Sequence, residues 1–361
     1  WGLVGLGMGV DPAMIFGLVS LMFLDTSINM AMQPFKMMVG DMVNEKQKGL
    51  AYSIQSFLCN AGSLVGFLFP FIFTWIGISN IAPQGVVPDS VIYSFYIGAA
   101  ILILCVIYTT VKVKEMPPAE YAEYHGITEE EEKEKINMVK LLIKAPKAFW
   151  TVGLVQFFCW FAFMFMWTYT NGSVAANVFD APTVETAVNG VSKVMLDTKS
   201  IQYQDAADWV GVLFAVQAIG SVLWAVCIPL FKDRKLIYSL SLVLGGLGFI
   251  STYFVHNQYV LFISFLLIGC AWAAMLALPF TILTNALSGG HMGTYLGLFN
   301  GTICIPQIVA ASLGGSILAL FTPKGMLPPE INMLVMAGVM LIIGAVCVYL
   351  IKETKGEQTK A

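Results

Sequence analysis

The sequence predicts an all-α polytopic membrane protein, and three observations lead to this fold class. Of its 361 residues, 58% are hydrophobic and 11% are charged, whereas a soluble domain carries about 25% charged residues. The apolar residues form continuous runs that approach or exceed the ~20 residues that a helix needs to span a bilayer. These runs do not alternate between apolar and polar residues, which excludes a membrane-spanning barrel of strands.

Nine apolar runs are predicted to be membrane-spanning helices. In chain order they cover roughly residues 12–42, 46–79, 90–114, 146–175, 207–231, 235–256, 258–287, 291–322 and 330–351. Residues 1–10 are Gly-rich and apolar, but they are too few to cross a bilayer. No charged region precedes this run, as it would in a signal peptide. We therefore expect a fragment that lacks the beginning of a longer protein.

Basic residues orient the predicted spans. If residue 11 lies outside the cell, sixteen of the 19 Lys and Arg residues fall in inside segments, and only Lys193, Lys199 and Lys324 fall outside. Because Lys and Arg accumulate in cytoplasmic loops, the C-terminus is expected in the cytoplasm. Nine spans that begin outside the cell end inside it, which agrees with a cytoplasmic C-terminus.

Two polar stretches separate the predicted helices. Residues 115–145 hold the charged run Glu129–Glu134 and are expected to form a cytoplasmic central loop. Residues 178–206 are expected to form an external loop. The predicted domains are a partial N-terminal helical bundle over 1–114, the central loop, and a C-terminal six-helix bundle over 146–361.

A weak internal repeat relates two pairs of spans. Met32-Gln-Pro-Phe35, followed by a polar turn and Gly49, is echoed by Ala277-Leu-Pro-Phe280, a polar turn and Gly293. The two proline positions are 245 residues apart, so the spans within 146–256 have no counterparts in this chain. Two parallel halves of six spans would explain the repeat, the central loop and the missing start together.

Two parallel halves joined by a long central loop resemble the major facilitator superfamily. A more specific resemblance is to plant sucrose transporters and their bacterial relatives, whose pattern is L-D-x-x-N-N-M-x-x-G-P-x-R-x-L-x-x-D. The matching residues are Leu24, Asp25, Asn29, Met30, Pro34 and Asp41. The sequence departs from the pattern at Ile28, Gln33 and Lys36. Further resemblance lies in Gln156-Phe-Phe-Cys-Trp160 and in the stretch from Gly293 to Pro306-Gln307.

This resemblance implies a secondary active transporter with about nine of twelve spans present. The glycoside–pentoside–hexuronide:cation symporters to which it points import sucrose, maltose or related glycosides with protons by alternating access. The implied location is the cytoplasmic (inner) membrane of a bacterium, and the expected partners are a small-molecule sugar and lipid, with the chain a monomer. No cofactor is expected, H⁺ being the coupling ion. The alternatives are another solute such as a muropeptide, coupling to Na⁺, or a membrane receptor or enzyme.

Asp25 is the central candidate, because an ionised carboxylate at membrane depth costs several kcal/mol unless it is paired, solvated or used. Desolvation favours the neutral acid, so Asp25 is predicted to carry the coupling proton; the alternative is a structural ion pair. Asn29 and Gln33 follow at helical spacing and fall near the same face. Amides both donate and accept hydrogen bonds, as sugar hydroxyls do, although amides also join membrane helices.

Other polar and aromatic residues are predicted to complete a sugar site drawn from several spans. Sugar rings also place their C–H groups against aromatic faces. Each of these polar residues taken alone is more often part of helix packing, but together they would give a polar lining drawn from several spans. The predicted substrate-binding residues beyond the first stripe are Gln55, Asn60, Gln156, Trp160, Gln217, Trp272, Asn300 and Gln307.

Two further groups have predicted mechanical roles. Lys36 and Asp41 lie at a cytoplasmic turn and are predicted to form part of a gate, the alternative being a solvated turn. Glycines at four-residue spacing, Gly62 with Gly66 and Gly297 with Gly301, predict close helix packing.

Several other function classes lack support in the sequence. The net charge of −3 argues against a nucleic-acid partner. The seven cysteines form no C-x-x-C pair, which gives no metal or disulfide pattern. No H-E-x-x-H, G-x-S-x-G or phosphate loop is present, so an enzyme is not predicted.

Overall fold

The computed structural model describes residues 12–43, 48–78, 89–114, 117, 120, 138–188, 191–231, 233–286, 292–323 and 325–351. In these ranges the chain is helical apart from one hairpin and short connections. The helices are α2 (Pro12–Met42), α3 (Lys48–Trp75), α4 (Asp89–Lys112), α7 (Met138–Ile143), α8 (Lys147–Asn177), α9 (Ile201–Cys227), α10 (Arg234–Ser251), α11 (Leu261–Ala286), α12 (Met292–Phe299), α13 (Gly301–Phe321) and α14 (Ile331–Cys347). The 3₁₀ turns η1 (Ile228–Leu230) and η2 (Val348–Leu350) continue α9 and α14.

Each of the nine predicted runs is helical, and eight helices of the described chain are long and apolar enough to cross a membrane. In α3, the described apolar stretch covers Phe57–Phe69, within a helix of 28 residues. The run predicted at 291–322 is divided at Asn300 into α12 and α13. The protein is therefore a polytopic α-helical membrane protein.

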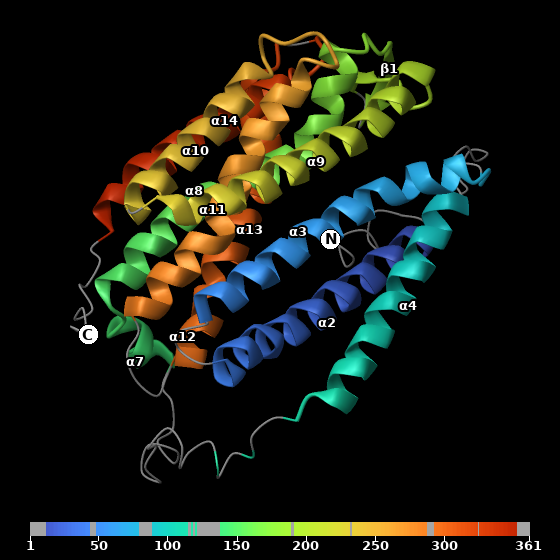
Figure 1. Ribbon diagram of the computed structural model, residues 1–361. Coiled ribbons are helices and arrows are strands. Elements are labelled where there is room, and N and C mark those ends of the chain that lie inside the picture. Colours follow the sequence, from blue (N-terminus) through green and yellow to red (C-terminus); the bar gives the residue numbers. More distant parts are fainter. Residues whose placement is uncertain are drawn as a thin grey trace.

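The helices form two groups (Figure 1). Helices α8, α9, α10, α11, α13 and α14 pack into one bundle, with α8 in contact with α9, α11, α13 and α14. Helices α2, α3 and α4 lie beside this bundle, and α3 packs along α9. The short helices α7 and α12 lie together at one end of the molecule, where the Tyr295 hydroxyl donates to the Leu141 carbonyl at 3.2 Å.

Glycines let the bundle helices approach closely. A Cβ at Gly220 of α9 would lie 2.6 Å from the Leu266 carbonyl oxygen of α11, and a Cβ at Gly338 of α14 would lie 2.6 Å from the Gly246 carbonyl oxygen of α10. Backbones in such contact gain van der Waals packing that larger residues would prevent. The glycines expected in this role lie elsewhere: Gly62, Gly66 and Gly297 have no described atom within 4 Å of such a Cβ.

The stretch expected as an external loop contains an antiparallel hairpin. Strand β1 (Thr183–Val188) pairs with β2 (Val191–Leu196), with Thr183 opposite Leu196. The sequence between the strands is Asn189-Gly190, a strong hairpin signal. Helix α9 also begins at Ile201 rather than near 207, because the Ser200 hydroxyl accepts a hydrogen bond from the Tyr203 N–H and caps the helix. We call this end of the molecule the hairpin end.

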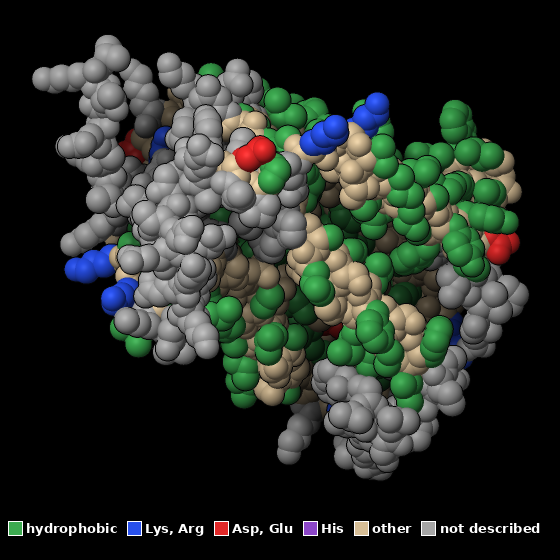
Figure 2. All heavy atoms as spheres, turned by 90° about the horizontal axis from the view of Figure 1, so that it is seen from below, with side chains coloured by type: hydrophobic (Ala, Val, Ile, Leu, Met, Phe, Trp, Pro, Cys, Tyr) green, Lys and Arg blue, Asp and Glu red, His purple; other side chains and the backbone are tan. Residues whose placement is uncertain are grey.

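Apolar side chains cover the outside of the helices. Figure 2 shows them over much of the described surface, with few charged side chains among them. On α4, the consecutive residues Ile101, Leu102, Ile103 and Leu104 are all exposed. Contiguous exposed apolar surface of this extent marks contact with lipid or another apolar partner, which agrees with membrane insertion.

The sequence repeat has a structural counterpart. Pro34 and Pro279 each lie within a long helix, α2 and α11, and the next helix begins shortly after each of them, α3 at Lys48 and α12 at Met292. In the view of Figure 1, α2 ends and α3 begins toward the end of the molecule where α12 lies. The central loop proposed as a domain boundary lies largely outside the described residues, so the domain division stays a prediction.

Candidate functional site in the helical bundle

Asp25 lies midway along α2, on an exposed face of the described structure. The Asn29 side chain amide donates to the Asp25 backbone carbonyl at 2.9 Å, so this bond ties Asn29 to its own helix. In the described part of the chain, no hydrogen bond or ion pair reaches the Asp25 carboxyl. The side chains of Gln33, Lys36 and Asp41 lie outside the described residues, and their predicted roles stay predictions.

On α3, the two predicted residues differ in their surroundings. Gln55 is half-buried, whereas Asn60 is only 2% exposed. The Ser221 hydroxyl of α9 donates to the Asn60 side chain oxygen at 3.1 Å. Asn60 therefore joins α3 to the bundle, which is the packing role that membrane-helix amides often have.

Gln156 and Trp160 lie one turn apart on α8 and are both buried, with 1% and 8% exposure. The Gln156 amide nitrogen donates to the Met275 carbonyl of α11 at 3.0 Å. Among the described residues, the Gln156 side chain oxygen and the Trp160 indole N–H have no hydrogen-bond partner. An unpaired acceptor and an unpaired donor at this depth are costly, and a hydroxyl group satisfies one of each kind.

Aromatic rings pack against Trp160. We call Trp160, Phe163 and Trp167 of α8 together with Trp272 of α11 the tryptophan cluster. The Trp272 ring centroid lies 5.8 Å from those of Trp160 and Trp167 and 4.9 Å from that of Phe163. Trp272 is half-buried and Trp167 is 43% exposed, so the cluster reaches from the bundle core to its surface. Such faces suit the apolar C–H side of a sugar ring.

The remaining predicted residues lie apart from this cluster. Gln217 of α9 is 6% exposed, and its backbone carbonyl oxygen packs against Gly269 of α11. Asn300 lies between α12 and α13, and Gln307 is half-buried on α13. No described hydrogen bond or ring contact links these three residues to the tryptophan cluster, and their place in a sugar site stays a prediction.

Glu330 is a residue of interest that the sequence reasoning missed. It directly precedes α14, and its carboxyl group occupies the space that a side chain at Gly172 of α8 would fill. Burial raises the pKa of Glu330 to about 7. The available signal was an acidic residue adjoining an apolar run, which we interpreted only as the boundary of a span.

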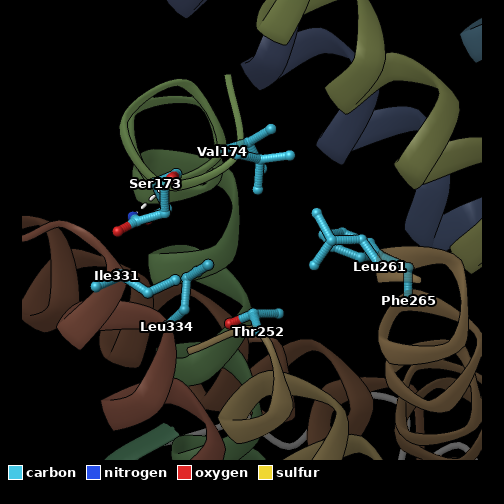
Figure 3. Close-up of a pocket in the computed structure, with 9 residues that line it drawn as sticks. Ser173, Val174, Thr252, Leu261, Phe265, Ile331 and Leu334 are labelled. Carbon is cyan, nitrogen blue, oxygen red and sulfur yellow. Dashed lines mark hydrogen bonds between the residues drawn. The ribbon is translucent and has the colours of Figure 1, made fainter. Parts of the chain in front are cut away.

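Two hollows lie near the hairpin end. One cavity of about 10 Å³ is walled by Ser173, Thr252, Ile331 and Leu334, which point into it from α8, the end of α10 and α14 (Figure 3). At this size it has room for at most about one water molecule. A larger open hollow of about 260 Å³ is lined by Asp205, Asp208 and Trp209 of α9. Neither hollow contains the tryptophan cluster, and no cluster of potential metal ligands occurs among the described residues.

Comparison with known proteins places the chain in a family. The family model of the Major Facilitator Superfamily matches residues 1–192 and again residues 174–361. No individual curated protein matches the chain. The two matches together span the whole chain and agree with its membrane-spanning helices. The protein is therefore a membrane transporter that belongs to the Major Facilitator Superfamily.

Proposed function

We propose that this transporter carries a sugar, of the sucrose or maltose type or a related glycoside, together with protons. The observation that supports the sugar is that, among the described residues, an acceptor of Gln156 and the indole donor of Trp160, one turn apart on α8, are both unpaired. A solute hydroxyl that donates to the first and accepts from the second satisfies both groups. The rings of the tryptophan cluster supply the apolar contact that a sugar ring needs.

The coupling role is assigned to Asp25. Its α2 helix is one of the eight apolar helices that can cross the membrane, and it is the acidic residue near the middle of that helix. A carboxylate in a spanning helix is functional by default. Protonation removes the cost of carrying the charge through the membrane, so proton binding and solute movement become linked. The further substrate residues and the gate of Lys36 and Asp41 belong to this proposal.

Uptake into membrane vesicles tests both parts of the proposal. We expect the full-length protein to accumulate a radiolabelled disaccharide and to lose accumulation when the proton gradient is dissipated. Asp25→Asn is expected to abolish accumulation, whereas Asp180→Asn, at an exposed position before the hairpin, should leave it unchanged. Full accumulation by Asp25→Asn would overturn the proton role.

A substrate panel separates the sugar from the coupling ion. Sugars, muropeptides and unrelated solutes are compared for uptake under a proton gradient and under a Na⁺ gradient. If a Na⁺ gradient drives uptake of a sugar, the proposed solute stands and the coupling ion is Na⁺ instead of H⁺. Uptake of a muropeptide without any sugar would overturn the assigned solute.

A further inference from the structure

The side chain of Glu330 packs against a neighbouring helix at the hairpin end of the bundle. A Cβ built on Gly172 of α8 would overlap the carboxyl carbon and both carboxyl oxygens of Glu330, with the farther oxygen at 2.8 Å. The carboxyl group therefore fills a notch that exists because residue 172 has no side chain. We call this the Gly172 notch.

This position is not the usual one for an acid at a helix start. An acidic side chain before a helix normally accepts hydrogen bonds from the first free N–H groups. Glu330 has helical backbone angles, φ −58° and ψ −24°, and its side chain makes no capping hydrogen bond. The carboxyl group is directed to α8 instead, so helix capping does not explain its place.

The surroundings of the carboxyl favour its neutral form. Tyr169 of α8 is the described titratable residue that interacts electrostatically with Glu330, and the Tyr169 hydroxyl lies over Gly314 of α13. The first turn of α14 carries no acidic residue. In the described part of the chain, no Lys, Arg or His forms an ion pair with Glu330. Burial without a cationic partner raises the pKa of the carboxyl to about 7.

We propose that Glu330 is a proton-binding site, and that loss of its proton drives the carboxyl group out of the Gly172 notch and loosens the contact between α8 and α14. The protonated acid packs in the notch as a neutral group. The carboxylate needs water or donors, and it reaches them by rotating away from α8. This site is separate from Asp25, and its test does not depend on transport or on the identity of the solute.

Infrared titration of the purified full chain tests the site directly. The carboxyl stretching band of a protonated acid should disappear as the pH rises through about 7. Glu330→Gln should lower the amplitude of that band by the share of one carboxyl group, whereas Asp205→Asn, an exposed acid near the start of α9, should leave it unchanged. A chain without any acid titrating near this pH, or a band of undiminished amplitude in Glu330→Gln, would overturn the proposal.

Gly172→Ala tests the notch while the acid remains. The added methyl group overlaps the carboxyl and forces it toward solvent, so the midpoint of the titration should fall by at least one pH unit toward the ordinary value of 4.5. Gly315→Ala is the matched control, because no described atom lies within 4 Å of a Cβ there. If the titration midpoint is unchanged in Gly172→Ala, packing in the Gly172 notch is not what keeps Glu330 protonated.

Discussion

The Ser221 hydroxyl of α9 donates a hydrogen bond to the side chain oxygen of Asn60 on α3, and the two oxygens are 3.1 Å apart. Ser221 is fully buried and Asn60 is 2% exposed. Close by along the same two helices, the rings of Phe67 and Phe214 lie 5.7 Å apart. A polar contact among apolar side chains fixes the register of two helices, because a shift would break this hydrogen bond.

Replacing either residue of this pair should weaken the contact between α3 and α9. Asn60→Ala and Ser221→Ala are each expected to lower stability by about 0.5–1.5 kcal/mol. A double-mutant cycle, measured as the unfolding of the protein in detergent, should show that the two losses do not add. Ser63→Ala on the same helix is a control, because the Ser63 hydroxyl donates to the Cys59 carbonyl of its own helix. Fully additive losses would contradict a direct interaction.

Gly269 is predicted to be intolerant of a side chain. A Cβ there would overlap the Gln217 carbonyl oxygen and lie 2.7 Å from the Ser221 backbone nitrogen, so Gly269→Ala must push α11 away from α9. We expect the free energy of unfolding of this variant to fall by about 1–3 kcal/mol, measured as a lower thermal midpoint. Gly297→Ala is the matched control: it meets no described atom and should stabilise its helix slightly, by up to about 1 kcal/mol. A neutral Gly269→Ala would refute the close contact.

The helices were predictable from the sequence, because long apolar runs have few alternatives in a membrane. The contacts between the helices were not predictable from the sequence. Gly297 and Gly269 are both glycines within apolar helices, and only the packing of α11 on α9 makes Gly269 a contact. The spacing of four residues predicted the wrong set, since it describes one helix and says nothing about which face meets a neighbour. The hairpin, in contrast, had the local signal Asn189-Gly190.

In the candidate site, too, positions along one helix were predictable and contacts between helices were not. Gln156 and Trp160 were placed on one face by their spacing, and in the structure both are buried on α8. Their partners Met275 and Trp272 lie on α11, up to 119 residues away in sequence. These contacts depend on how α8 and α11 pack. Glu330 was missed for a related reason. Its raised pKa comes from burial, and the carboxyl lies where a side chain at Gly172 of another helix would be. No local pattern links residue 330 to residue 172.

The indole N–H of Trp160 should contribute to solute affinity through one hydrogen bond. Trp160→Phe keeps an aromatic ring and removes the donor, so we expect affinity for the transported sugar to fall roughly tenfold, as one hydrogen bond of about 1.4 kcal/mol implies. Because the indole N–H is unpaired in the described structure, stability should not fall for lack of that bond. Trp150→Phe, at an exposed position on the same helix, is the control. Unchanged affinity in Trp160→Phe, measured by uptake competition, would remove Trp160 from the site.

The stability of the protein should depend on pH through Glu330. Its pKa is raised from 4.5 to about 7 in the folded protein, so the folded state holds the proton more tightly than the unfolded state. The resulting stabilisation is fully present below about pH 4.5 and is lost as the pH rises through about 7. Relative to Glu330→Gln, which cannot titrate there, the wild-type protein should lose stability by at most about 1.4 kcal/mol per pH unit across this window. Thermal unfolding in detergent at several pH values measures the difference, with Asp205→Asn expected to follow the wild type. A difference that grows in favour of the wild type as the pH rises would mean that the anion, and not the neutral acid, is the form that packs against Gly172.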